Sequence, residues 1–212
     1  MQPAPKIHIV TRDNRHLYKD QMEDTFRIRH VVYVKERGWK ALDRPDEREI
    51  DQFDTEQARY LVVLEGERVI GGMRMVPTTA PTLMSELFPQ LCIRPLIQRL
   101  DVFELSRIFV IPEKRGEQTR PNIQDLLLCG VMEYGLEEGM SQFTIVLETW
   151  WLPRLQDRGW RVTPLGLPED IDGMSTIAVA VEVADDSVVQ LRQDQGITGT
   201  LLVRQGLERL RA

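Results

Sequence analysis

A two-residue turn between two apolar runs constrains the fold of this chain more than any other feature. The runs span residues 59–65 and 68–76, and Gly66-Glu67 joins them. A glycine-containing pair between runs of this kind is typical of a tight β-hairpin. The first half of the 212-residue chain therefore contains a pair of antiparallel strands.

The other segments alternate between strand and helix patterns. Alternating apolar and polar residues predict strands, and apolar residues at steps of three to five predict helices. The further strands are expected at 6–11, 101–111, 143–147, 160–165 and 176–183, and the helices at 14–37, 82–91, 119–138 and 152–158. Gly38 stops the first helix, Thr82 can cap the second, and an acidic loop runs from about 40 to 56. We expect one α/β domain over residues 1–212, with a mostly antiparallel sheet.

Charge and composition exclude several classes of function. The net charge is −6, so we expect no broad surface for a polyanion and no nucleic-acid partner. The two cysteines, Cys92 and Cys129, form no CxxC pair, which suits a reducing compartment. The three histidines lack metal-binding spacing, so no metal is expected. No apolar run reaches membrane-spanning length, and we expect a cytoplasmic protein without membrane contact.

The segment FELSRIFV (103–110) places two charged residues, Glu104 and Arg107, in an apolar strand. Charged side chains in such a run are rarely buried without partners, so a structural ion pair is the alternative to a functional site. Residues three apart on a regular strand point to opposite faces. The two side chains can share a site only if a β-bulge lies between them.

Arginine and aromatic side chains form a second set of candidates. Arg74 follows two glycines inside the 68–76 run, and such glycines indicate a bulge or a close backbone approach. Arg74 would then lie where a ligand comes near the sheet, unless it is an edge-strand arginine in solvent. Arg29 and Tyr33 are four residues apart and share a helix face, while Trp39 follows the helix stop. Each aromatic ring can belong to the core or to a ligand wall.

The stretch IPEKRGEQTRPN (111–122) connects a predicted strand to a predicted helix. An Arg-Gly turn that opens onto a helix N-terminus can hold a pyrophosphate on free backbone N–H groups, as in acyl-CoA transferases. Only Arg115-Gly116 of such a loop is present, so a plain turn is an equal alternative. Lys114, Arg115 and Arg120 stand where the phosphates of a CoA would lie.

The acidic loop raises its own question, because EREIDQFD (47–54) holds four carboxylates in eight residues. The loop is either a solvated segment or a cluster that holds something positive. Loop carboxylates of this kind are expected to contribute little to the core.

Together these segments resemble the acyl-homoserine lactone synthases, the autoinducer synthases of bacterial quorum sensing. The resemblance rests on RHVVYVKERGW (29–39), EIDQFDTEQARYLV (49–62), GGMRMVPTTAPTLMSELFPQL (71–91), ELSRIFV (104–110) and LPRLQDRGW (152–160). These segments follow family order at nearly family spacing. The resemblance implies an N-acetyltransferase-like fold: a twisted sheet with helices on both faces, bulged in the strand that holds Glu104.

The resemblance also implies a reaction without a cofactor. The enzyme would join S-adenosylmethionine to an acyl thioester, close the lactone and release methylthioadenosine. The family's functional positions fall on Arg29, Trp39, Asp51, Asp54, Arg74, Phe88, Glu104 and Arg107. Glu104 and Arg107 would be catalytic, with Glu104 as the base, and backbone N–H groups at the bulge would stabilise the thioester oxyanion.

The substrate sites follow from the same positions. Asp51 and Asp54 would face the positive charges of S-adenosylmethionine, with Arg29 and Arg74 holding these carboxylates in place. Tyr33 stands in the same site, where the family usually has phenylalanine. Three other acids of the loop, Asp46, Glu47 and Glu49, would be its solvated flank.

The acyl pocket of the family lies between the sheet and the C-terminal helices. Phe88 would line it, and FTIVLETWWLP (143–153) brings Trp150 and Trp151 to the end of a buried strand in that region. Two large rings would shorten the pocket and favour a short, branched or aryl acyl group. The alternative is that both tryptophans belong to the core.

The acyl donor is expected to be a CoA thioester. RIRH…YV…ERGW and TIVLETWWLPRL (144–155) resemble the rhizobial synthases that use acyl-CoA, so we expect isovaleryl-CoA first and cinnamoyl- or coumaroyl-CoA second. The basic residues that would dock an acyl carrier protein are few: Arg154, Arg158 and Arg161, diluted by Asp157. A carrier-protein-dependent synthase, another N-acyltransferase and a non-catalytic acyl-CoA-binding module are the alternatives.

Overall fold

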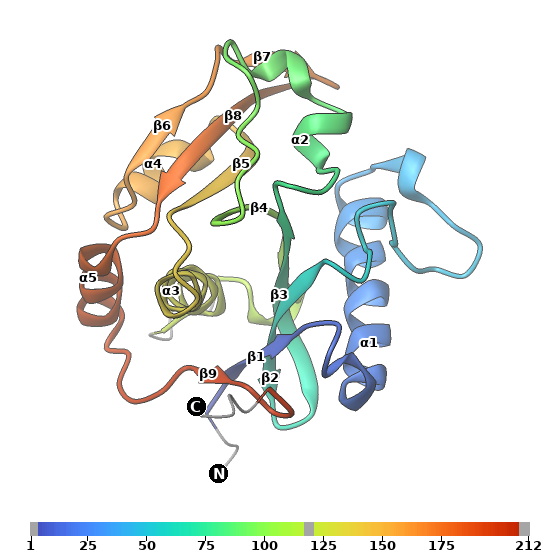
Figure 1. Ribbon diagram of the computed structural model, residues 1–212. Helices are drawn as coiled ribbons and strands as arrows, with labels where there is room; N and C mark the ends of the chain where they lie inside the picture. Colours follow the sequence, from blue (N-terminus) through green and yellow to red (C-terminus); the bar gives the residue numbers. More distant parts are fainter. Residues whose placement is uncertain (1–3, 117–120, 208–212) are drawn as a thin grey trace. The chain divides into compact units, whose positions relative to one another are not determined.

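The computed structural model describes residues 4–116 and 121–207 (Figure 1). The chain divides into two compact units. Unit 1 comprises residues 1–74, 107–130 and 199–212, and unit 2 comprises residues 75–106 and 131–198. Both units include parts of strand β3 (Arg68–Pro77), strand β4 (Val102–Val110) and helix α3 (Ile123–Glu137). The single domain expected from the sequence stays a prediction.

The strands of unit 1 are hydrogen-bonded in the order β4-β3-β2-β1-β9. Strand β1 (Lys6–Val10) is antiparallel to β2 (Arg59–Glu65) and parallel to the short β9 (Leu202–Val203). Strands β2 and β3 form the predicted hairpin, and Gly66 in its turn has a φ of +66°. This is left-handed backbone that glycine adopts without steric penalty.

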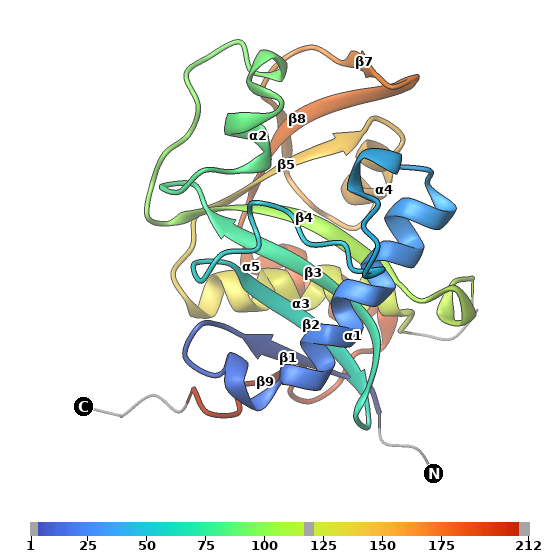
Figure 2. The same cartoon turned by 90° about the vertical axis from the view of Figure 1, so that its right-hand side faces the viewer.

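Helices cover both faces of strands β1 to β3 within unit 1. Helix α1 (Lys19–Arg29) lies on one face, and the N-terminal part of α3 lies on the other (Figures 1 and 2). A Cβ added to Gly71 would lie only 2.8 Å from Cγ2 of Ile123, and one added to Gly72 would lie 3.0 Å from the carbonyl oxygen of Leu61. The predicted close backbone approach is confirmed: the Phe109 carbonyl oxygen of β4 would lie 3.1 Å from a Cβ on Gly71, while α3 meets Gly71 through a side chain. At Gly72 the close atom is the Leu61 carbonyl oxygen of β2.

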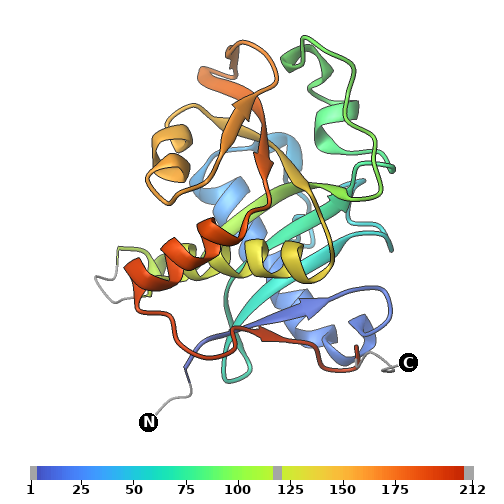
Figure 3. The ribbon, with the colours of Figure 1, turned by 60° about the vertical axis from the view of Figure 1, so that its left-hand side comes forward.

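In unit 2 the strand order is β6-β8-β5-β4-β3, and β7 also pairs with β8. The strands are β5 (Gln142–Glu148), β6 (Val162–Pro164), β7 (Glu169–Ile171) and β8 (Met174–Glu182), and the helices are α2 (Leu83–Glu86), α4 (Trp151–Gln156) and α5 (Asp185–Gln195). Strand β5 is parallel to β4, whereas β8 is antiparallel to β5, β6 and β7. Helix α5 lies beside the C-terminal part of α3 (Figure 3), where Arg192 bonds to Glu133. The mostly antiparallel sheet with helices is confirmed.

The helix predicted at 14–37 ends within one residue of the prediction, but α1 starts only at Lys19, after a separate 3-10 helix (Arg15–Leu17), and the last part is not an α-helix. The side chain of Asn14 accepts a hydrogen bond from the Thr11 N–H and donates one to the Ile9 carbonyl, so it closes a turn and does not cap α1. From His30 the helix widens into a π-helix that ends at Glu36. A pattern based on 3.6 residues per turn cannot predict this change.

The other predicted boundaries differ less from the structure, but two strands and one α-helix were not predicted. Helix α2 starts where predicted, because Thr82 caps it by accepting a hydrogen bond from the Ser85 N–H, but it ends at Glu86 and is followed by a separate 3-10 helix. Helix α3 starts at Ile123, later than the predicted start at Thr119, which lies outside the described residues. Strands β7 and β9 and helix α5 have no counterpart in the prediction. No helix in the described part of the chain is long and apolar enough to cross a membrane.

Candidate active site

Arg29, the last residue of α1, is the first member of a buried ion network in unit 1. Its Nε donates to Glu49 at 2.5 Å, and its two terminal nitrogens donate to the two oxygens of Asp54 at 2.7 and 2.9 Å. The Arg29 side chain is 1% exposed. A guanidinium this deeply buried requires such bidentate partners.

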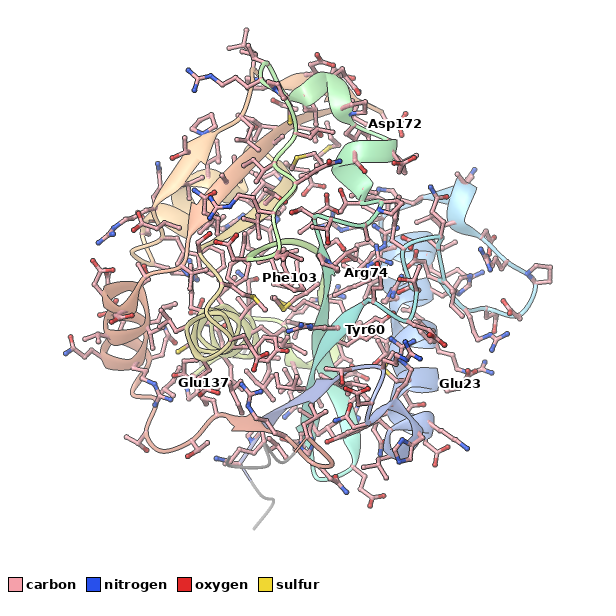
Figure 4. The ribbon with its side chains drawn as sticks, viewed as in Figure 1. Glu23, Tyr60, Arg74, Phe103, Glu137 and Asp172 are labelled. Carbon is pink, nitrogen blue, oxygen red and sulfur yellow. The ribbon has the colours of Figure 1, made fainter. Side chains whose placement is uncertain are left out.

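Strand β3 supplies the second arginine of the network. Arg74 binds both oxygens of Asp51, at 2.5 and 3.1 Å, and also lies 3.0 Å from Asp54. The hydroxyl of Tyr60 donates to the same Asp54 oxygen at 2.8 Å. Tyr60 and Arg74 lie between the strands and α1 (Figure 4). The alternative of a solvated edge-strand arginine is wrong, because the Arg74 side chain is 1% exposed.

Strand β4 supplies the third arginine. The guanidinium of Arg107 donates to Glu49 at 3.1–3.2 Å and to Asp51 at 2.8 Å. Arg107 has a φ of +54°, a left-handed conformation within β4 that residues with a side chain rarely adopt. The β-bulge expected between Glu104 and Arg107 stays a prediction.

Three guanidinium groups and three carboxylates thus form one network, and their formal charges cancel. Asp51 and Asp54 are held by Arg29 and Arg74 as the resemblance implied, but the carboxylates are satisfied by arginines of the protein itself. Burial alone would raise the pKa of Asp54. Hydrogen bonds and charge from Arg29, with the charge of Arg74, outweigh burial and hold that pKa well below its usual range.

Glu49 was assigned wrongly to the solvated flank of the loop. It is completely buried and joins Arg29 to Arg107, whereas Asp46 and Glu47 are exposed as predicted. The burial of Glu49 could have been predicted by counting charges. Three arginines in apolar segments need three carboxylates, and Asp51 and Asp54 supply only two.

Aromatic rings cover one side of the network. Tyr33, in the π-helix, stacks on Trp39 with ring centroids 5.0 Å apart, and the Arg107 guanidinium lies 5.4 Å from the Tyr33 ring. The Tyr33 hydroxyl donates to the carbonyl oxygen of Ile108 at 2.6 Å, so the hydroxyl that distinguishes it from the usual phenylalanine binds backbone. Trp39 is 39% exposed, Asp51 has an 11% exposed side chain and Arg107 is 9% exposed. These three residues form the accessible side of the network.

Glu104 lies in unit 2 and has different partners. Its two oxygens accept hydrogen bonds from the N–H groups of Leu83 and Met84, both at 2.8 Å, at the start of α2. The residue is 1% exposed. Glu104 therefore fixes α2 to strand β4, a structural role that the sequence did not indicate.

An apolar groove of about 600 Å³ lies in the same unit, lined by residues 92–97 and 163–166. Phe88 packs against the buried cluster of Met84, Leu91 and Ala178, together with Cys92, Leu96 and Leu165 of the groove wall. Burial and the charge of Glu104 raise the pKa of the Cys92 thiol. The groove therefore adjoins the predicted acyl-pocket residue Phe88 and lies within reach of the Glu104 charge.

The two tryptophans stack on each other at the end of β5, with ring centroids 5.0 Å apart. Trp150 is 40% exposed, and the Arg154 guanidinium lies 4.4 Å from its ring. The alternative that both rings belong to the core is wrong for Trp150.

Two of the predicted CoA-binding cations have carboxylate partners in the structure. Lys114 donates to Glu65 at 3.1 Å, and Arg115 donates to Glu36 at 2.6 Å. Gly116 has a φ of +72°, as a tight turn before α3 requires. Arg120 lies outside the described residues.

Comparison with known proteins shows which family the chain belongs to. The family model for autoinducer synthases matches residues 13–191. The chain is 42% identical to the isovaleryl-homoserine lactone synthase of Bradyrhizobium diazoefficiens, over 97% of this chain and 92% of that one. The chain belongs to the autoinducer synthase family.

Solved structures agree with this assignment. The CoA-dependent acyl-homoserine lactone synthase BjaI, with SAM and isopentyl-CoA, has a TM-score of 0.90 and 39% identity, over 95% of this chain and 93% of that one. The CoA-dependent synthase MesI has a TM-score of 0.86 and 38% identity, over 93% and 98%. A putative N-acetyltransferase from Lactobacillus plantarum, at 21% identity and a TM-score of 0.59 over 86% and 100%, shows that the fold is shared with that class. The N-acetyltransferase-like fold is confirmed.

The network predicts a large stability effect at Asp54, contrary to the sequence expectation that loop carboxylates contribute little to the core. Asp54→Asn breaks a buried ion pair, so the free energy of unfolding should fall by about 3–5 kcal/mol in a urea titration at pH 7. Because folding lowers the pKa of Asp54, its contribution is fully present above the unfolded-state pKa of about 3.9. The contribution is lost as the pH falls from that value toward the folded-state pKa. The difference in the free energy of unfolding between the wild type and Asp54→Asn should therefore shrink over this pH range.

The matched control is Asp46→Asn, which changes an exposed carboxylate of the same loop. An exposed ion pair is screened by solvent and contributes little to stability, so this variant should unfold close to the wild type. Equal stability of Asp54→Asn and Asp46→Asn would contradict the structural role of the network.

Proposed function

We propose that the protein synthesises an N-acyl-homoserine lactone from S-adenosylmethionine and an acyl-CoA, releasing methylthioadenosine. The observation that carries the proposal is the charge-balanced network, five of whose six members (all but Glu49) occupy positions that the resemblance implies are functional. Its accessible side presents Asp51, Arg107 and Trp39. The names of the related synthases support the choice of substrates.

The accessible side of the network matches the groups of S-adenosylmethionine. A sulfonium is attracted to an aromatic face, which Trp39 offers. The substrate amino group can donate to Asp51, and its carboxylate can accept from the Arg107 guanidinium. Because the network is neutral, recognition depends on the placement of single groups and not on an excess of negative charge.

The reaction has two steps. The α-amino nitrogen of S-adenosylmethionine loses a proton and attacks the thioester carbonyl, forming an amide and releasing the CoA thiol, which takes up a proton. A carboxylate oxygen then attacks the γ-carbon and breaks its bond to sulfur, which leaves as neutral methylthioadenosine. The second step is intramolecular, so a bound conformation that brings the oxygen to the γ-carbon supplies much of the acceleration.

Glu104 is the proposed base for the first step. Both of its oxygens already accept backbone hydrogen bonds, so a proton would reach it along a further lone pair, directly or through a water. The rival role is structural, since the same carboxylate holds the start of α2. The two roles give different results when α2 is weakened by another route.

Glu104→Gln should lower kcat by about 10²–10⁴-fold if the carboxylate acts as a base. Thr82→Ala removes the cap of the same helix, and a lost cap lowers stability by about 0.5–2 kcal/mol. We expect Thr82→Ala to retain most of its activity in a methylthioadenosine-release assay. Equal losses of kcat in both variants would assign Glu104 to holding α2 alone.

The groove lined by Cys92, Leu96 and Leu165, with Phe88 beside it, is the proposed site for the acyl chain. Trp150 is expected to limit the chain length by filling part of this region. We expect Trp150→Ala to raise the rate with octanoyl-CoA relative to isovaleryl-CoA by about tenfold. The control is Leu167→Ala, an apolar residue that is 74% exposed. An unchanged chain preference in Trp150→Ala would contradict the role of the ring.

Acyl-CoA is the proposed donor, and acyl carrier protein is the alternative. Arg161 donates to Glu182 at 2.9 Å and also bonds to Asp186, and Arg158 donates to the Arg154 carbonyl. Two neighbouring acids thus offset one of the few cations that would dock an acidic carrier protein. We also propose that the enzyme works in the cytoplasm, where both substrates are found, without a nucleic-acid or membrane partner.

The donor is tested by measuring methylthioadenosine release with isovaleryl-CoA and with isovaleryl-carrier protein. We expect kcat/KM to be about tenfold or more higher for the CoA thioester. Turnover of the carrier-protein thioester alone would overturn the donor assignment. Acylation of a different small amine, with no methylthioadenosine released from S-adenosylmethionine, would instead identify an N-acyltransferase for that amine.

A further inference from the structure

The backbone of Arg107 is held from outside its own strand. Arg107 has a φ of +54°, which side-chain-bearing residues rarely adopt. Such conformations persist only where the surrounding structure holds them. The next carbonyl along the chain, that of Ile108, accepts a hydrogen bond of 2.6 Å from the Tyr33 hydroxyl.

The π-helix places Tyr33 in position to make this bond. The helix widens at His30, and Tyr33 lies inside the widened segment with 4% of its surface exposed. Its carbonyl accepts a hydrogen bond from the Trp39 N–H at 3.0 Å, and its ring stacks on the Trp39 ring. Tyr33 is therefore held both through its backbone and through the face of its ring. The hydroxyl thus has little freedom to leave the Ile108 carbonyl.

The Tyr33 hydroxyl also remains a donor at any ordinary pH. Burial raises the pKa of Tyr33, although the charge of Arg107 opposes this effect. The hydroxyl therefore keeps its proton, and the hydrogen bond does not depend on ionisation near neutral pH.

We propose that the Tyr33 hydroxyl is a positioning group. By holding the Ile108 carbonyl, it fixes the left-handed turn at Arg107 and so directs the Arg107 guanidinium toward Asp51 and the carboxylate of S-adenosylmethionine. This inference rests on the proposed function for the identity of the substrate. Without the hydroxyl, β4 can relax toward a regular strand at this point, and the guanidinium loses its fixed direction.

The test is Tyr33→Phe, which removes the hydroxyl and keeps the ring that contacts Trp39 and Arg107. We expect kcat/KM for S-adenosylmethionine to fall by about 10–100-fold, as for a small misplacement of a binding group. The KM for isovaleryl-CoA should stay within about twofold of the wild type, because the change is confined to one substrate. Amide hydrogen exchange of a peptide covering residues 105–111 should become faster.

The matched control is Tyr18→Phe. Tyr18 is equally buried, with 2% exposed, and its hydroxyl bonds to His8 Nδ1 at 3.0 Å. This variant also loses one tyrosine hydroxyl from unit 1. We expect its kcat/KM for S-adenosylmethionine and its amide hydrogen exchange at residues 105–111 to match the wild type.

Full activity of Tyr33→Phe toward S-adenosylmethionine would overturn the inference and leave the proposed function intact. A Tyr33→Phe protein that does not fold, by circular dichroism, would also overturn it, because the hydroxyl would then hold the whole fold. If the wild type shows no activity with any acyl thioester, the proposed function fails separately. The exchange measurement then decides the positioning role, and unchanged exchange at residues 105–111 would overturn it.

Discussion

The buried network of three arginines and three carboxylates holds together the parts of unit 1 that regular secondary structure does not. The loop that follows the π-helix contains only short turns and one 3-10 helix (Lys40–Leu42) of its own. Glu49, Asp51 and Asp54 attach that loop to α1, β3 and β4 through their arginines. Burying ions is expensive, and an apolar cluster of equal volume is often at least as stable. We therefore interpret the network as a device for directing side chains, for which directional charged hydrogen bonds are better suited than apolar contacts.

This interpretation separates the family's functional positions into two kinds. Arg29, Arg74 and Asp54 are almost fully buried and act as the frame. Asp51, Arg107 and Trp39 keep some exposed surface and form the accessible side of the network, where the proposed substrate would bind. Position in sequence does not distinguish the two kinds, because both occur in the same short segments. The exposure of the side chains does distinguish them. We expect substitution of a buried position to lower stability, and substitution of a partly exposed position to weaken binding of the substrate.

The sequence predicted what depends on local rules. The β2–β3 hairpin follows from Gly66, the start of α2 from Thr82, and the close packing at β3 from paired glycines. It failed where the outcome depends on distant residues. Glu49 is buried because it pairs with Arg29 and with Arg107, which lies 58 positions later, and β9 is a strand only because β1 lies beside it. Helix α5 buries just three residues (Ser187, Val188 and Leu191), too few to give a clear apolar period. The π-helix and the left-handed Arg107 obey no periodic rule.

The pairing of Lys114 with Glu65 and of Arg115 with Glu36 has a consequence for how an anionic donor would arrive and leave. Each cation already holds a carboxylate of the same chain, so an incoming phosphate would replace an anion and would not fill an empty position. On departure of such a donor, the two carboxylates would pair with their cations again. The exchange would make phosphate binding weaker than at two unpaired cations, because the two existing ion pairs must first be broken.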